Sequence, residues 1–281
     1  MKLLRYGPVG QEKPGLLDSK GAIRDLSGVI ADVNGASLAA DSLAKLARID
    51  PASLPLVAGL PRLGPCVGNV GKFLCIGLNY ADHAAETGAA VPSEPVVFTK
   101  ATSAIIGPND DVARPRGATK LDWEVELGVV IGKKALYVSE AEASDHIAGY
   151  CVVNDLSERN FQLERPGNQW DKGKGCDTFG PIGPWLVTRD EAGDVGNLAM
   201  WLEVNGKRFQ NGSTATMVYK PAFLVSYLSR FMSLYPGDVI STGTPPGVGM
   251  GQKPPLFLNP GDKMRLGITG LGEQNQTVIQ A

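Results

Sequence analysis

Three acidic residues border two apolar segments, and together they could hold a metal ion. Glu124 and Glu126 open the segment Glu124–Ile131, and on a strand two residues at this spacing point to the same face. Asp155 comes shortly after a second apolar segment, Gly149–Val153. Neighbouring carboxylates repel one another and are costly to bury, and a divalent cation removes the repulsion. Oxygen ligands suit a hard ion such as Mg²⁺ or Mn²⁺, with about three octahedral positions left for water and substrate.

A second interpretation of the paired glutamates stays open at this point. Glu124 and Glu126 would also fit the solvated face of a strand, where neighbouring carboxylates are unremarkable. Beyond Glu126, however, residues of both faces are apolar, as expected of a strand that runs into the core. The chain contains only two histidines, which excludes a histidine-rich zinc or copper site and agrees with an all-oxygen site.

His83 and Glu86 could form a device that activates water. They are three residues apart in a predicted helix, Asp82–Thr87, which follows the predicted strand Phe73–Leu78, and they therefore share one helical face. A carboxylate so placed can orient an imidazole and raise its basicity. A single histidine on a helix is more often structural, so the residues alone leave both interpretations open.

The elements that must position these side chains are predicted to be mainly strands. The 35 glycines and 20 prolines favour short strands and tight turns over a helical bundle. Apolar segments of strand length recur without regular alternation with helices, which predicts a mixed, mostly antiparallel β-rich (α+β) fold. The remaining predicted strands are Lys2–Tyr6, Leu16–Leu17, Ala22–Leu26, Val96–Thr99, Trp185–Val187, Met200–Val204, Val239–Thr242 and Lys263–Ile268, and the remaining predicted helices are Ser37–Ile49, Glu140–Ala148 and Pro221–Met232.

The composition bounds the class of protein and its division into domains. Prolines and glycines concentrate between Pro51 and Gly71, which predicts a small N-terminal domain and linker over residues 1–70 and a catalytic domain over residues 71–281. The formal net charge of −2 gives no electrostatic footprint for nucleic acid or an anionic membrane. No signal peptide or membrane-spanning segment is recognisable, and the four cysteines form no C-x-x-C pair. We therefore expect reduced thiols in a cytoplasmic protein.

Five blocks of sequence occur in an order that resembles the fumarylacetoacetate hydrolase family. The resemblance covers roughly residues 70 to 281, and it implies a β-roll catalytic domain, a divalent metal, a homodimer, and cleavage, decarboxylation or isomerisation of 2-oxo acids. The N-terminal residues also resemble the extra small domain of bacterial members that include diketo sugar-acid hydrolases and ureidoglycolate lyases. The five blocks are Ile76–His83, Asp122–Leu127, Asn154–Arg159, Lys174–Pro184 and Ser241–Gly249.

The resemblance also implies a role for individual residues of the site. The implied metal ligands are Glu124, Glu126 and Asp155, and the implied catalytic residues are the water-activating dyad His83 and Glu86 together with Lys174, which faces the substrate oxygens. The implied substrate-binding residues are Arg159, Gln162, Thr178 and Thr244. Lys172 is an additional basic residue near the site for which the resemblance implies no role.

From these features we expect a hydrolase that depends on Mg²⁺ or Mn²⁺ and splits a carbon–carbon bond of a 2,4-diketo acid. The products would be pyruvate and a carboxylic acid, and a diketo-deoxy sugar acid is one candidate substrate. The dyad favours hydrolysis over decarboxylation, since a decarboxylase has no obligatory need for a general base. Ureidoglycolate lyase and an oxaloacetate-type decarboxylase or isomerase are the alternatives. The complete set of acidic and basic residues argues against a metal-free binding protein.

Overall fold

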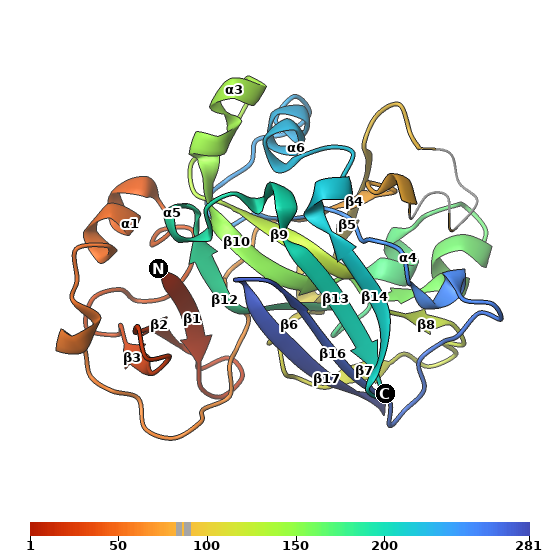
Figure 1. Ribbon diagram of the computed structural model, residues 1–281, viewed down its shortest axis with the longest axis horizontal. Coiled ribbons are helices and arrows are strands. Elements are labelled where there is room, and N and C mark those ends of the chain that lie inside the picture. Colours follow the sequence, from red (N-terminus) through yellow and green to blue (C-terminus); the bar gives the residue numbers. More distant parts are fainter. Residues whose placement is uncertain (83–85, 87–90) are drawn as a thin grey trace.

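The computed structural model describes residues 1–82, 86 and 91–281, and its main elements are strands (Figure 1). The largest sheet has ten strands, with β9 and β10 near its middle. Its order is β3 (Ile23–Asp25), β2 (Lys13–Leu17), β1 (Lys2–Tyr6), β12 (Gly180–Thr188), β10 (Ile147–Asn154), β9 (Val125–Ile131), β15 (Val239–Ser241), β4 (Phe73–Gly77) and β5 (Val96–Lys100), with β6 (Ile105–Ile106) paired to β12.

A second sheet of five strands packs against the first, and a two-stranded ribbon lies beside them. The order of the second sheet is β14 (Lys207–Ser213), β13 (Ala199–Val204), β16 (Lys263–Ile268), β17 (Gly272–Gln280) and β7 (Val112–Arg114), and the ribbon pairs β8 (Leu121–Asp122) with β11 (Ser157–Glu158). Among the paired strands of the described residues, only β4–β15, β6–β12 and β7–β17 are parallel. The predicted mixed, mostly antiparallel β fold is therefore confirmed.

Strand β9 is buried on both faces, as its sequence of apolar residues requires. Val125, Leu127 and Val129 belong to a core cluster that also includes side chains of the second sheet. Val130, on the opposite face, packs in a second cluster with Leu3 of the N-terminal segment. The alternation of faces predicted for the glutamates is therefore present, because the side chains at even and odd positions of β9 enter different clusters.

The N-terminal strands continue the large sheet. Strand β1 is hydrogen-bonded in antiparallel register to β12, with Lys2 opposite Val187 and Leu3 opposite Leu186. In Figure 1 these strands lie at one end of the molecule, and the domain boundary that we predict near residue 70 falls just before β4.

The helices are short and lie at the periphery of the sheets (Figure 1). The predicted helix Glu140–Ala148 is too long, since helix α3 ends at Ala143 and is followed by a 3-10 turn, Ser144–His146. Its last predicted residues are part of β10, where Ile147 pairs with Ile131 of β9. The predicted helix Asp82–Thr87 lies largely outside the described residues. The described α-helices are α1 (Ala40–Leu46), α3 (Glu140–Ala143), α4 (Asp171–Lys174), α5 (Arg189–Ala192) and α6 (Pro221–Leu228).

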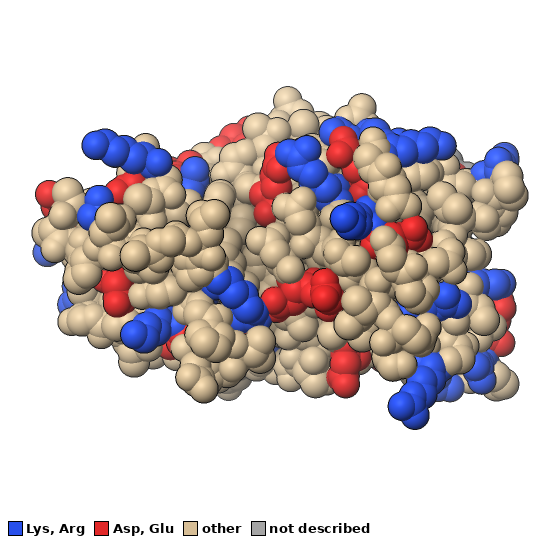
Figure 2. Space-filling view, turned by 90° about the horizontal axis from the view of Figure 1, so that it is seen from below, with Lys and Arg blue, Asp and Glu red and all other residues tan. Residues whose placement is uncertain are grey.

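The other global features concern cysteines, surface charge and membrane segments. All four cysteines are free thiols, as predicted. Figure 2 shows one face of the molecule, on which basic and acidic side chains are interspersed. In the described part of the chain, the helices all fall short of the length and apolarity that crossing a membrane requires.

Strands β10 and β12 approach so closely at Gly149 that a side chain has no room there. A Cβ atom at Gly149 would lie 2.2 Å from the Val187 carbonyl oxygen, so the backbone would have to shift. We predict that Gly149→Ala lowers the free energy of unfolding by about 1–3 kcal/mol, the usual cost of overpacking, as measured by urea denaturation. Gly28→Ala is the matched control, since a Cβ there meets nothing within 4 Å. Equal unfolding midpoints for the two variants would contradict the prediction.

Candidate metal centre

The three predicted carboxylates come together where β9 begins and β10 ends. These strands are antiparallel neighbours, with Val153 opposite Glu126, so the start of one lies beside the end of the other. The Asp155 amide also donates to the Glu124 carbonyl oxygen at 2.9 Å, which fixes the two residues relative to each other. One oxygen from each of Glu124, Glu126 and Asp155 lies within 4.8 Å of the others, and all three residues are buried.

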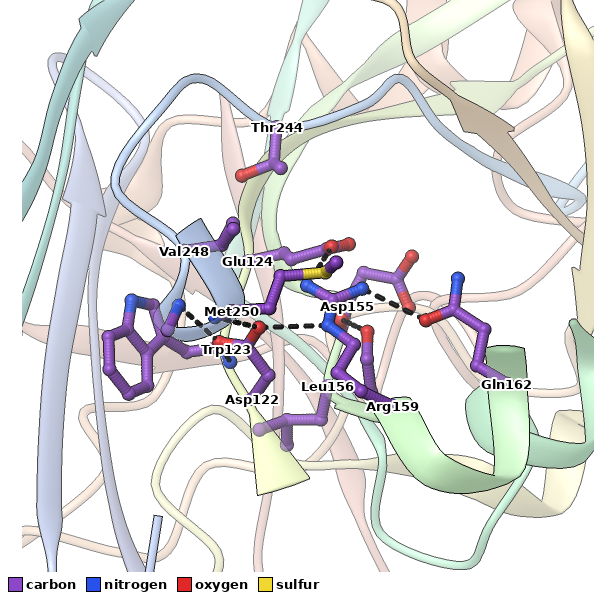
Figure 3. A network of polar contacts seen from close by, with 12 residues as sticks. Asp122, Trp123, Glu124, Asp155, Leu156, Arg159, Gln162, Thr244, Val248 and Met250 are labelled. Carbon is purple, nitrogen blue, oxygen red and sulfur yellow. Dashed lines mark hydrogen bonds and ion pairs between the residues drawn. The ribbon is translucent and has the colours of Figure 1, made fainter. Parts of the chain in front are cut away.

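Two cations that we predicted as site residues bind this acidic group directly. The Lys174 ammonium, at the end of α4, donates to Glu124 Oε2 at 2.7 Å and to Asp155 Oδ2 at 2.8 Å. The Arg159 guanidinium donates to Glu124 Oε1 at 2.7 Å and to Asp122 Oδ2 at 2.8 Å (Figure 3). Burial lowers the pKa of each cation, but the adjacent carboxylates raise both pKa values above their ordinary range, so both side chains stay charged.

Lys100 is a third cation of the site, and our sequence analysis missed it. Its buried ammonium donates to Asp155 Oδ1 and, at 3.0 Å, to the Leu156 carbonyl oxygen. Lys100 is the last residue of β5, an otherwise uncharged strand at the edge of the large sheet. The sequence signal that could have found Lys100 is its position as the single charged residue at the end of this strand. A lysine that is buried there needs an anionic partner.

Asp122 is a further residue that sequence reasoning did not single out. Besides the Arg159 guanidinium, its carboxylate accepts the backbone N–H groups of Gly249 at 2.6 Å and Met250 at 3.0 Å. Asp122 therefore connects the cationic side of the site to the glycine-rich loop 247–251.

Glu126 is held by groups that leave one of its oxygens toward the cavity. Glu126 Oε2 accepts from the Ser241 hydroxyl at 2.6 Å and from the Gly243 amide at 2.8 Å. Burial, followed by the negative charges of Asp155 and Glu124, raises the pKa of Glu126 well above its usual range. A charge imbalance adds to the effect of burial, because four carboxylates of the cluster (those of Asp122, Glu124, Glu126 and Asp155) face three cations.

These residues fit a hard divalent cation. All the converging ligand atoms are carboxylate oxygens, and the excess negative charge is buried, where screening is weaker than in bulk water. In the described part of the chain, the ligand atoms of at least three acidic, histidine or cysteine side chains come close enough to share a metal ion at this group. The geometry therefore supports the predicted ligand set of Glu124, Glu126 and Asp155.

A cavity of about 220 Å³ opens onto Glu124 and Glu126. Its polar lining comes from the ends of strands and from the turn Asn160–Glu164. Gln162 accepts from the Arg159 guanidinium at 2.9 Å through its amide oxygen, which leaves the amide NH₂ group as a donor. The Thr244 hydroxyl donates to the Val125 carbonyl oxygen at 2.9 Å and accepts from Gln210 at 2.8 Å. The polar lining residues are Glu124, Glu126, Arg159, Gln162, Lys174 and Thr244.

Thr178, a predicted substrate-binding residue, and Lys172 make contacts outside the cavity. The Thr178 hydroxyl accepts from the Ala113 amide at 2.9 Å, and Thr178 is absent from the described residues that line the cavity. The Lys172 ammonium donates to the Pro166 carbonyl oxygen at 2.9 Å, so this lysine, whose role the sequence left open, holds its own loop. Spacing along the chain indicated neither orientation.

The predicted dyad is described only in part. His83 lies outside the described residues. Glu86 is described, and both oxygens of its carboxylate accept from the Gly247 amide, at 2.9 and 3.1 Å. A Cβ atom at Gly251 would also meet the Glu86 side chain. Glu86 therefore lies against the same loop 247–251 that Asp122 contacts, and Met250 of this loop lines the cavity.

Asn79 fixes the chain just beyond β4, next to the site. Its buried carboxamide donates to the carbonyl oxygens of Thr242 at 2.7 Å and Tyr219 at 3.0 Å, and it accepts from the Tyr219 amide at 2.7 Å. All three contacts are to backbone atoms, so the position of Asn79 does not depend on the side chains around it.

Comparison with known proteins places this geometry in a family. The sequence profile described as "Fumarylacetoacetate (FAA) hydrolase C-terminal" matches residues 72–279. A Burkholderia orbicola protein provisionally named a hydrolase is 67% identical over 282 residues, which cover 100% of each chain. A solved fumarylacetoacetate hydrolase from Exiguobacterium antarcticum is 33% identical, with a TM-score of 0.86 and 100% of each chain covered. A Mycobacterium abscessus structure provisionally described as a 2-hydroxyhepta-2,4-diene-1,7-dioate isomerase is 32% identical, with a TM-score of 0.85 and coverage of 100% and 99%.

We predict that Glu124→Gln or Asp155→Asn removes Mg²⁺ binding but leaves a folded protein. Each change keeps the size of a ligand but turns an amide NH₂ group toward a buried cation that the carboxylate accepts from, so the metal-free variant should unfold at a lower temperature while remaining folded at about 25 °C. Mg²⁺ at about 100 times its dissociation constant stabilises the native protein by about 2.7 kcal/mol, and this increment should vanish in a thermal-shift measurement. Glu273→Gln, in an exposed surface ion pair with Arg265, is the matched control. A Mg²⁺-dependent shift retained in both variants would contradict the site.

The raised pKa of Glu126 predicts that the apparent affinity for Mg²⁺ increases with pH. The cation binds the carboxylate form, so a proton competes with it until the pH exceeds the pKa of the folded protein. Below that pKa, the dissociation constant measured by calorimetric titration should fall by about ten-fold per pH unit. Glu126→Gln should bind more weakly and lose this dependence. The same slope in both proteins would show that Glu126 is not the competing group.

Proposed function

The chain belongs to the fumarylacetoacetate hydrolase family, and we propose that it is a Mg²⁺-dependent hydrolase that splits a carbon–carbon bond of a 2,4-diketo acid. Family and relatives establish a hydrolase- or isomerase-type enzyme. The observation that carries the finer proposal is the buried group of Glu124, Glu126 and Asp155, with Lys174 bound to it, at the wall of a cavity. Such a group needs a cation, and the cavity gives a substrate access to it.

The metal would be held by the three carboxylates. A bound divalent cation supplies positive charge to the keto and carboxylate oxygens of a 2-oxo acid and favours negative charge that develops on them. This is the reason for proposing a 2-oxo acid, since two neighbouring oxygens match the positions that three protein ligands leave open.

Lys174 and Gln162 are the side chains that we propose to contact the substrate. The Lys174 ammonium has three N–H groups, of which Glu124 and Asp155 accept two, so a third remains for a substrate oxygen. A fixed positive charge at that point stabilises a developing oxyanion. The Gln162 NH₂ group, oriented through its oxygen by Arg159, is a neutral donor to a second oxygen. Arg159 thus acts by positioning Gln162 and Glu124.

The water-activating step is proposed from the sequence, through His83 and Glu86. In this step His83 removes a proton from water, and the hydroxide adds to the C4 carbonyl. The C3–C4 bond then breaks, its electron pair stays with the pyruvate fragment, and C3 takes up a proton. The products are pyruvate and the carboxylic acid formed from C4. Glu86 would orient the imidazole, and its contact with Gly247 would fix Glu86 itself.

An isomerase of a related 2-oxo acid is the second candidate. The observation in its favour is the similarity to the Mycobacterium abscessus protein provisionally described as such an isomerase. Isomerisation moves a proton between carbons and needs no water. Incubation with Mg²⁺ and a panel of acylpyruvates, oxaloacetate, diketo sugar acids and ureidoglycolate separates the reactions, since only C–C hydrolysis yields pyruvate together with a second acid. Glyoxylate and urea without pyruvate would overturn the proposal in favour of a lyase.

Mutation of the proposed base and of the lysine should affect two reactions differently. We predict that His83→Ala loses about 10²–10⁴-fold in acylpyruvate hydrolysis, the usual contribution of a general base, but retains more of any oxaloacetate decarboxylation. Lys174→Met should lower both rates, because both reactions develop negative charge at the same oxygens. Mg²⁺ binding should persist in Lys174→Met, since two carboxylates lose a competing cation. Steady-state rates for both substrates, with calorimetric Mg²⁺ titration, check these outcomes.

Glu86→Gln is the matched control for the dyad. It retains an oxygen that can accept from Gly247, so its defect should be milder than that of His83→Ala. Equal losses of hydrolysis and decarboxylation in His83→Ala would show that the dyad does not activate water.

A further inference from the structure

We propose that the cavity selects 2-oxo acids whose far end is uncharged and apolar, and that it disfavours those with a second carboxylate there. The proposal rests on the proposed function, which places the 2-oxo acid group at the metal centre. It concerns the rest of the cavity, where the acyl group of the substrate would lie.

The cations that line the cavity are both ion-paired with carboxylates of the acidic group. Among its described lining residues, Arg159 and Lys174 are the basic ones. The Arg159 guanidinium donates to Asp122, Glu124 and Gln162. Lys174 is bound to two of the metal-binding carboxylates and belongs to the end of the cavity where the 2-oxo acid group would bind. A distant carboxylate on the substrate therefore has no cation of the lining as its partner.

The chain segment between β4 and β5 supplies no cation either. Residues 79–95 contain neither lysine nor arginine, and their charged residues are Asp82, Glu86 and Glu94, besides His83. The basic residues that follow Gln162 along the chain are bound elsewhere. Arg165 donates to Asn160, and Lys172 donates to the Pro166 carbonyl oxygen. Neither Arg165 nor Lys172 is among the described residues that line the cavity.

The apolar part of the cavity lining is built around Trp170 and begins at Phe98, whose ring centroid lies 5.0 Å from the Lys174 ammonium. The indole packs directly on the backbone of Gly77, since a Cβ atom there would lie 2.4 Å from its ring. Phe98 meets the same indole edge-on, with ring centroids 5.4 Å apart. Trp170 is thereby held between a glycine and an aromatic ring, and its exposed part forms a fixed surface for an apolar group. The apolar side chains that line the cavity are Ile76, Leu78, Phe98, Leu163, Trp170 and Met250.

Leu163 marks the outer part of this wall. Its side chain is 43% exposed although it follows Gln162, which is buried and points its amide toward the metal-binding residues. A large apolar side chain in this position gains contacts when a ligand covers it. Burial of each methylene raises affinity by about four-fold, whereas burial of an unpaired carboxylate lowers it strongly.

The test is calorimetric binding of non-cleavable 2-oxo acids to the Mg²⁺-loaded full chain. The ligands are pyruvate, 2-oxopentanoate, 2-oxoglutarate and the 5-methyl ester of 2-oxoglutarate, which carries a methyl group at the far end in place of the negative charge of 2-oxoglutarate. We expect the affinity for 2-oxopentanoate to exceed that for pyruvate by at least about four-fold. We expect 2-oxoglutarate to bind at least about ten-fold more weakly than its ester.

A charged variant at the rim makes the test specific. Leu163→Arg places a cation in an exposed position beside the apolar wall and should raise the affinity for 2-oxoglutarate by about three- to five-fold, the value of an exposed ion pair. Its affinity for the ester should not rise. Leu60→Arg adds the same charge at a fully exposed residue of the N-terminal segment and should leave every affinity unchanged.

Each outcome of these titrations is decisive. If 2-oxoglutarate binds as tightly as its ester while pyruvate binds in a Mg²⁺-dependent manner, the selectivity proposal is overturned and the proposed function stands. If no 2-oxo acid binds with Mg²⁺ present, the proposed function fails, and the selectivity fails with it. An equal rise for ester and acid in Leu163→Arg would also overturn the assignment of charge selectivity to this wall.

Discussion

Excess negative charge in a dry place is the constraint on which this structure depends. The carboxylates of Glu124, Glu126 and Asp155 lie where two central strands of the large sheet meet, and both faces of those strands are covered. Buried charges lose most of the solvation that bulk water would give them, so partners must come from the protein or its ligands. Lys100, Lys174 and Arg159 reach the same point from β5, from α4 and from the segment after β11. The arrangement of these peripheral elements is thus tied to the chemistry at the centre.

The cavity divides this chemistry into two parts with different physical origins. Around the buried carboxylates, polar groups are fixed by hydrogen bonds to one another, as Gln162 is by Arg159. At the other end, position is fixed by close packing, as in the contact of Trp170 with Gly77. The first part discriminates by charge and oxygen geometry, and the second by shape and apolar area. A substrate must satisfy both ends at once, which is how a family with a shared reactive centre can serve different compounds.

Sequence reasoning succeeded where the pattern reflects local physics. Continuous apolar segments of strand length located the central strands, and the spacing of Glu124 and Glu126 placed both carboxylates on one face. It missed β17, whose Gln274 and Gln276 look like surface residues but are buried and bonded to backbone carbonyl oxygens of distant segments. Lys100 was missed for the same reason, since its partner Asp155 lies 55 residues away along the chain. Partners that only the fold brings together leave no local signal.

The anchoring of Asn79 has a consequence for how such an enzyme can diversify. Because its carboxamide holds backbone atoms of two distant segments, the chain is pinned where it leaves β4. After it has re-entered the sheet as β5, the chain is held again at the last residue of this strand, where Lys100 is bound to Asp155. Insertions, deletions or exchanges between these two pins need not disturb the carboxylates. A change in this connection, which carries His83 and Glu86 in the sequence, would therefore alter the reaction while the group of Glu124, Glu126 and Asp155 stays in place.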